Sequence, residues 1–156
     1  MEGYLRRTEY MARKSTTTYP TTAIMLDHFS WLHVPALLSA TPMFFGGLFH
    51  GLLRPQAALL TWGMTDQIAR SREAQIVYYG HTMRTSTLGL LVFALYLQGN
   101  LAGVDTTMAV MGGYCGIADV LTIWYHGNRS VAPFRLLSVL CIAAWGLAGM
   151  TASSAP

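Results

Sequence analysis

Four long apolar segments divide the chain, and each is close to the length that a membrane-spanning helix needs. They run from about 29 to 53, from 76 to 97, from 106 to 125 and from 132 to 150. A helix needs about 20 predominantly apolar residues to cross the hydrocarbon core of a bilayer. The pattern therefore predicts an all-α fold, an integral membrane four-helix bundle.

Polar and helix-breaking residues separate the first two apolar segments. Pro55 suits the first turn of a helix, and Gly63 would end one. The stretch between them is predicted to form a short interfacial helix between the first and second spans, with Trp62 at the membrane surface. The two later connections are short, so consecutive spans should be antiparallel neighbours.

Prolines and glycines inside the spans predict bends and close helix contacts. Pro35 and Pro42 lie in the first span, where we expect a kink that neighbouring helices tolerate. Small residues three or four positions apart let helix backbones approach closely in lipid. Such pairs are Gly112 and Gly116 in the third span, and Gly146 and Gly149 in the fourth.

The chain before the first span is polar and rich in threonine. Residues 1–24 are predicted to be a flexible polar tail, and residues 25–152 to form a single four-span membrane domain. A secretory leader would show a basic stretch, a short apolar core and a small-residue cleavage site. We recognise no such pattern near the start, so membrane entry would rely on the first span.

Composition agrees with a lipid environment. The chain is 53% hydrophobic and only 11% charged, whereas a soluble domain carries about 25% charged residues. Its net charge of +3 comes from basic residues scattered in pairs, which argues against nucleic acid as a partner. The basic residues divide almost evenly between the two sides, so they do not decide the orientation. We expect a multi-pass protein of the endoplasmic reticulum.

Polar residues within the spans are the candidates for chemistry, because they are costly in hydrocarbon and usually face the bundle interior. Two groups share helical faces. They are Tyr78, His81, Arg84 and Thr85 in the second span, and Cys115, Asp119, Thr122 and His126 in the third.

Arg84 and Asp119 are strong charges deep in these two spans, and antiparallel packing would bring them to similar depth. A buried ion pair is therefore predicted. It would be either a structural clasp that fixes helix register or part of a catalytic centre.

Three segments carry a resemblance to a known family. They read GGLFHGLLRPQAALLTWGM, YYGHTMRTSTLGLLVFAL and GGYCGIADVLTIWYHGN. In this order they resemble an uncharacterised family of small four-span fungal integral membrane proteins, a domain of unknown function, over roughly residues 29–150. Gly80, Arg84 and Asp119 stand where that family has a glycine, an arginine and an aspartate.

Members of the family often appear beside polyketide or terpenoid biosynthetic enzymes. The resemblance thus implies secondary-metabolite biosynthesis and a tailoring step on a lipophilic intermediate. Enzymes of this kind include epoxide-opening hydrolases, cyclases and isomerases, none of which needs a cofactor.

The polar residues permit such chemistry. Asp119, oriented by Arg84, is the candidate base. The candidate proton donors are Tyr78, Tyr79 and His81. Asp66, from the surface helix, is a candidate second carboxylate.

A non-catalytic role stays open beside the enzymatic one. In that reading the chain is a membrane accessory protein that scaffolds enzymes or transports a metabolite. The expected partners are a lipophilic small-molecule substrate and membrane lipid, with biosynthetic enzymes or a second copy of the chain as further possibilities. The sequence has no nucleotide-binding glycine loop, haem-attachment motif or metal-type cysteine spacing, so we expect no cofactor and no metal.

Overall fold

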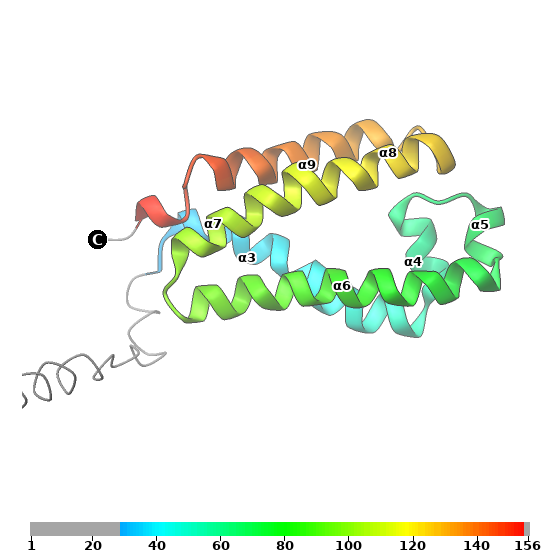
Figure 1. Ribbon diagram of the computed structural model, residues 1–156, viewed down its shortest axis with the longest axis horizontal. Helices are drawn as coiled ribbons and strands as arrows, with labels where there is room; N and C mark the ends of the chain where they lie inside the picture. The colour runs from blue at the N-terminus through cyan, green and yellow to red at the C-terminus, as the bar shows by residue number, and fades with distance from the viewer. Residues whose placement is uncertain (1–28, 155–156) are drawn as a thin grey trace, which may run out of the picture.

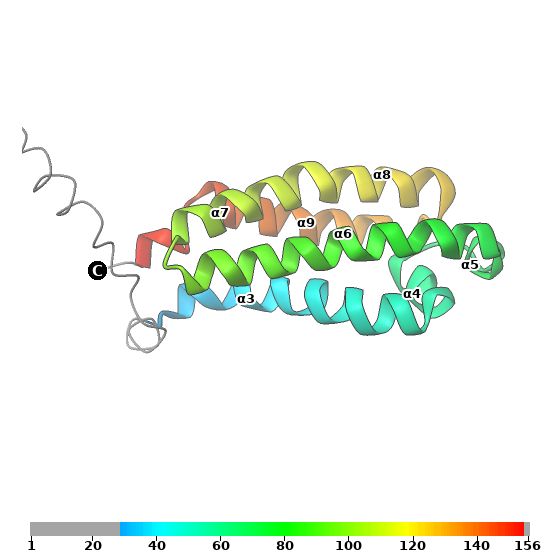
Figure 2. The same cartoon turned by 60° about the horizontal axis from the view of Figure 1, so that its bottom comes forward.

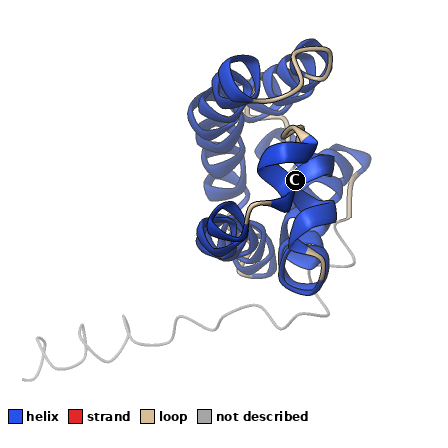
Figure 3. Ribbon diagram, turned by 90° about the vertical axis from the view of Figure 1, so that its right-hand side faces the viewer, coloured by secondary structure: helices blue, strands red, loops and turns tan. Residues whose placement is uncertain are grey.

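A computed structural model describes residues 29–154, and regular structure within that range is helical (Figure 3). This confirms the all-α prediction. The predicted tail at residues 1–24 lies outside the described residues. The helices in chain order are η1 (Trp31–His33), α3 (Val34–Thr41), η2 (Pro42–Gly51), α4 (Pro55–Trp62), α5 (Asp66–Arg70), α6 (Arg72–Leu97), α7 (Leu101–Val110), η3 (Met111–Gly116), α8 (Ile117–His126), α9 (Ala132–Leu147) and η4 (Ala152–Ser154).

Two continuous helical stretches are long and apolar enough to cross a membrane. Trp31–Gly51 has 21 residues and Leu101–His126 has 26. The helix α6 also has 26 residues but carries more polar side chains, and α9 is apolar but shorter, with 16 residues. The predicted second span, 76–97, corresponds to α6, which begins four residues earlier at Arg72.

Proline changes the type of helix in the first stretch. At Pro42 the α-helix α3 gives way to the π-helix η2, in which backbone hydrogen bonds reach one residue further. Proline has no backbone N–H and therefore cannot continue the α-helical hydrogen bonding. Pro35 lies in the first turn of α3, where no intrahelical hydrogen bond depends on its nitrogen.

The helices form two hairpin-like pairs that separate along their length (Figure 1). In one pair α3 and η2 pack along α6, and in the other α7, η3 and α8 pack along α9. The pairs meet at the end that holds the α6–α7 turn. At the opposite end, seen also in Figure 2, α4 and α5 lie beside α6. The predicted short helix therefore exists, with Gly63 ending it at φ 108°, and it fills the space between the pairs.

Polar side chains and glycines hold the first pair together. The Thr82 hydroxyl donates to the Gly47 carbonyl at 3.0 Å, and the Ser86 hydroxyl donates to the Phe44 carbonyl at 3.0 Å. A Cβ at Gly47 would lie only 2.9 Å from Ser86 Cβ, so the glycine is needed for this approach. Sequence analysis did not identify this contact.

Three of the four glycines singled out for packing do pack. Gly112 and Gly116 face α9, and Gly146 faces the backbone of Asp105 and Ala109 on α7. Gly149 does not, because its added Cβ would meet nothing within 4 Å. It instead takes φ +61° in the turn that follows α9.

Substitution of Gly112 by alanine should destabilise the fold. Its Cβ would lie 2.5 Å from the Val139 carbonyl and 2.6 Å from the Ala143 nitrogen, and both are backbone atoms that cannot move aside. Overpacking of this kind costs about 1–3 kcal/mol. Gly113→Ala is the matched control, since its Cβ would meet only the Ala143 Cβ at 3.9 Å. Thermal unfolding in detergent should show a lower midpoint for Gly112→Ala alone, and equal midpoints would contradict the close approach.

A buried polar cluster lies at the end where the pairs meet. His33 Nδ1 is 3.0 Å from the Tyr96 hydroxyl, and both side chains are buried. The Asp105 carboxylate, 3% exposed, accepts hydrogen bonds from the backbone N–H groups of Thr151 at 3.1 Å and Ala152 at 2.7 Å. These bonds fix the C-terminal segment across that end of the bundle.

Candidate functional site

An aromatic stack joins α4 to α6 at the other end of the molecule. The Trp62 ring stacks on His81 with centroids 4.5 Å apart and planes inclined by 26°. Tyr78, one turn earlier on α6, lies 5.4 Å from His81 and 5.8 Å from Trp62. Because Gly63 ends α4 directly after Trp62, the tryptophan is held at the helix terminus with its ring against α6.

Asp119 reaches the same place from α8. Its half-buried carboxylate interacts electrostatically with His81 and with Arg135 of α9. The buried indole nitrogen of Trp62 lies close to this carboxylate, without the geometry of a standard hydrogen bond. Four helices, α4, α6, α8 and α9, therefore contribute to one cluster, which we call the Asp119 cluster: Trp62, Tyr78, His81, Asp119 and Arg135.

Arg135 is the cation of this cluster, and sequence analysis did not select it. Its Nη2 donates to the Thr61 carbonyl at 2.7 Å, which ties α9 to the end of α4. It also interacts electrostatically with Tyr78 and Asp119. The clue in the sequence was its position one turn inside the fourth apolar segment, where an unpaired charge is costly.

The predicted buried ion pair between Arg84 and Asp119 does not form. Arg84 is exposed, and the ion pair within 4.0 Å among residues 29–154 joins Arg70 and Asp66. An α-helix turns about 100° per residue, so Arg84 lies roughly 60° around α6 from His81. That rotation moves it from the cluster to the outer face, although its charge still acts on His81.

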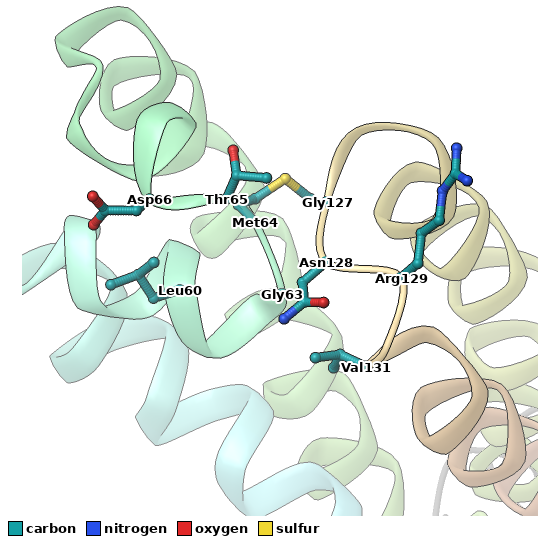
Figure 4. Close-up of a pocket in the computed structure, with 9 residues that line it drawn as sticks. All are labelled: Leu60, Gly63, Met64, Thr65, Asp66, Gly127, Asn128, Arg129 and Val131. Carbon is teal, nitrogen blue, oxygen red and sulfur yellow. The ribbon is translucent and has the colours of Figure 1, made fainter.

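Asp66 does not join the cluster either. It begins α5, where its Oδ2 lies 2.8 Å from Nε of Arg70, and its side chain is 58% exposed. Figure 4 shows it at the edge of a pocket of about 510 Å³ between the α4–α5 turn and the α8–α9 loop. Arg70 lies four residues further along the chain, so the two side chains are neighbours on the helix surface. Asp66 therefore pairs with Arg70 and not with a group of the interior.

The Asp119 cluster combines groups suited to proton transfer. It holds a carboxylate, an imidazole, a phenol and a guanidinium, within a site lined by the indole of Trp62. Thr85 Oγ1 lies 3.5 Å from Nε2 of His81 and is a polar neighbour of the ring. Among the described residues, no three His, Cys, Asp or Glu side chains gather as metal ligands would.

The fold and the cluster define a class of protein: an all-helical chain with membrane-length apolar helices and a polar site between them. Residues 40–149 match the domain of unknown function DUF4267, and the chain belongs to that family. The resemblance to an uncharacterised family is thereby confirmed. No curated protein and no solved structure shows significant similarity to the chain.

Proposed function

We propose that the chain crosses a membrane four times, in the endoplasmic reticulum, through Trp31–Gly51, α6, Leu101–His126 and α9. Large apolar side chains exposed on all of these stretches support the proposal. Examples are Leu38 at 69%, Val77 at 75%, Tyr114 at 77% and Leu147 at 79% exposure. Soluble proteins rarely expose large apolar patches, so hydrocarbon is the solvent that suits large apolar side chains this exposed on every stretch.

Within that setting, we propose a cofactor-free tailoring enzyme that acts on a lipophilic polyketide or terpenoid intermediate. The single observation behind this proposal is the Asp119 cluster. A carboxylate beside an imidazole, with a phenol and a guanidinium next to them, supplies a base, two acids and an anion-stabilising charge. Epoxide opening, cyclisation and isomerisation need such groups and no redox partner.

Epoxide opening illustrates how the groups would act. Asp119 accepts a proton from water, or from a hydroxyl of the substrate, as that oxygen attacks one epoxide carbon. The carbon–oxygen bond breaks, and the leaving oxygen takes a proton from protonated His81 or from Tyr78. Arg135 stabilises the negative charge that develops on that oxygen. Return of the proton from Asp119 to His81 or Tyr78 restores the site, and the product is a diol with water or a cyclic ether with a hydroxyl.

A structural observation favours a second candidate, a non-catalytic accessory protein. The Trp62–His81 stack and the Arg135–Thr61 hydrogen bond also fasten α4 between the two helix pairs. The cluster would then be a clasp, and the protein would scaffold biosynthetic enzymes or transport their metabolite.

Deletion of the gene in its native host, followed by metabolite profiling, tests the proposal. The enzyme predicts accumulation of one lipophilic precursor, an unopened epoxide or an uncyclised chain. Membranes that contain the protein should convert this precursor without added cofactor, and in ¹⁸O-labelled water a hydrolase would place the label in the product. Lower amounts of every late metabolite, with no conversion by the membranes, would contradict the enzyme and support the accessory role.

A further inference from the structure

Trp62 belongs to the Asp119 cluster, but the proposed reaction gives it no step. We propose that Trp62 is the positioning residue of this site: its indole N–H holds one oxygen of the Asp119 carboxylate, and its ring holds the imidazole of His81. The consequence for catalysis rests on the proposed function, whereas the hydrogen bond and the stack do not.

The backbone on both sides of Trp62 is bonded to the part of the chain that forms α8 and α9. The Thr61 carbonyl accepts a hydrogen bond from Nη2 of Arg135 at 2.7 Å. The Gly63 carbonyl accepts one from the Asn128 N–H at 2.8 Å, where the α4–α5 turn meets the α8–α9 loop (Figure 4). The tryptophan between these two carbonyls is therefore fixed relative to the second helix pair.

The ring of Trp62 contacts the first helix pair at His81. The two rings are stacked, with centroids 4.5 Å apart and planes inclined by 26°. Tyr78 packs against both rings, at 5.4 Å from His81 and 5.8 Å from Trp62. Aromatic contacts of this kind favour particular ring orientations. The stack therefore restricts rotation of the imidazole and keeps its nitrogens in constant directions.

The indole N–H of Trp62 is a buried donor without a standard hydrogen bond among residues 29–154. A buried donor that has lost water and gained no acceptor is costly. The Asp119 carboxylate is the acceptor that lies close to it. Rotation of the carboxylate would complete a charge-assisted N–H···O⁻ bond, which is stronger than a bond between neutral groups.

An indole is well suited to hold a catalytic base. Its nitrogen donates a hydrogen bond and does not accept one, so it orients the carboxylate without competing for the proton. With one oxygen of Asp119 bonded to Trp62, the other oxygen is left to accept the proton in the proposed reaction. One side chain thus sets the positions of a base on α8 and an acid on α6.

Replacement of Trp62 by 3-benzothienylalanine tests the N–H alone, because sulfur takes the place of nitrogen and the bicyclic ring keeps its shape. The kcat for the accumulated precursor should fall about 10–100-fold, the effect of losing a hydrogen bond to a charged group. KM should change little, since the ring that lines the site remains. Trp62→Phe, which keeps a ring over His81 but has no N–H, should show the same separation of kcat from KM.

Trp145 provides the matched control. Its indole nitrogen is also buried without a hydrogen-bond partner among the described residues. It lies ten residues beyond Arg135 on α9, about 15 Å along the helix axis. The same two replacements at Trp145 should leave kcat unchanged, and circular dichroism should confirm that all four variants are folded.

Indole ¹H–¹⁵N spectra of the protein in detergent test the hydrogen bond without turnover. The chain has four tryptophans, and the signal that Trp62→Phe removes is that of Trp62. Asp119→Asn should move the proton resonance of this signal upfield, because a neutral amide oxygen is a weaker acceptor than a carboxylate. Asp66→Asn should leave it in place.

Two results would overturn the positioning role of Trp62. One is a Trp62 signal that does not move in Asp119→Asn, and the other is a normal kcat in the benzothienylalanine variant. Membranes with the unaltered protein that fail to convert the precursor would instead overturn the proposed function alone, because the spectra report the bond whatever the activity.

Discussion

Replacement of Asp119 by asparagine should leave a folded protein whose conversion of the accumulated precursor is about 10²–10⁴-fold slower, the usual contribution of a general base. Asparagine keeps the shape of the side chain and its place beside Trp62 and His81 but cannot accept the proton. The measurement is the conversion rate in membranes that contain equal amounts of folded protein.

Asp66→Asn is the control for the loss of an acidic group. Asp66 is exposed and paired with Arg70, so this variant should convert the precursor at nearly the normal rate. Full activity of Asp119→Asn would show that Asp119 is not the base. Loss of folded protein instead of activity would mean that the Asp119 cluster is a clasp.

Arg135→Gln should lower the conversion rate by about 10²–10³-fold, as removal of a group that stabilises developing negative charge usually does. Arg84→Gln should have little effect, because Arg84 is exposed and makes no ion pair among the described residues. One variant removes a positive charge inside the Asp119 cluster, and the other removes one outside it. Their comparison tests the structure against the pairing that the sequence suggested.

Arg135→Lys tests whether a positive charge at this position is sufficient. Lysine keeps a positive charge near Asp119 and a donor for the Thr61 carbonyl, so partial recovery of the rate is expected. Normal activity of Arg135→Gln beside a severe loss in Arg84→Gln would show that the wrong arginine has been placed in the cluster.

Local sequence patterns predicted the helices well. Pro55 and Gly63 bound α4 as expected, since one suits a first turn and the other takes the left-handed conformation that ends a helix. Gly112 and Gly116 face α9 because their lack of side chains allows the backbones to meet. These features depend on neighbouring residues or on a single helix face.

The candidate site was only partly predictable. Tyr78, His81 and Asp119 do come together, but their cation is Arg135 rather than Arg84. The sequence favoured Arg84 because consecutive spans were expected to face each other along their whole length. The helix pairs instead separate, and α4 enters between them, which no pattern within one span could reveal. Asp105 was overlooked because it stands one residue before the predicted third span, although its carboxylate is buried.

The described chain begins and ends at the same end of the bundle, opposite α4 and α5 (Figure 1). In a bilayer, the hydrocarbon core of about 30 Å would then lie between the chain ends and the pocket. On that topology, a domain fused after the last described residue would lie on the opposite side of the membrane from the pocket. On the proposed topology, enzymes that exchange a metabolite with the Asp119 cluster would act from the side of the membrane that the α4–α5 turn faces.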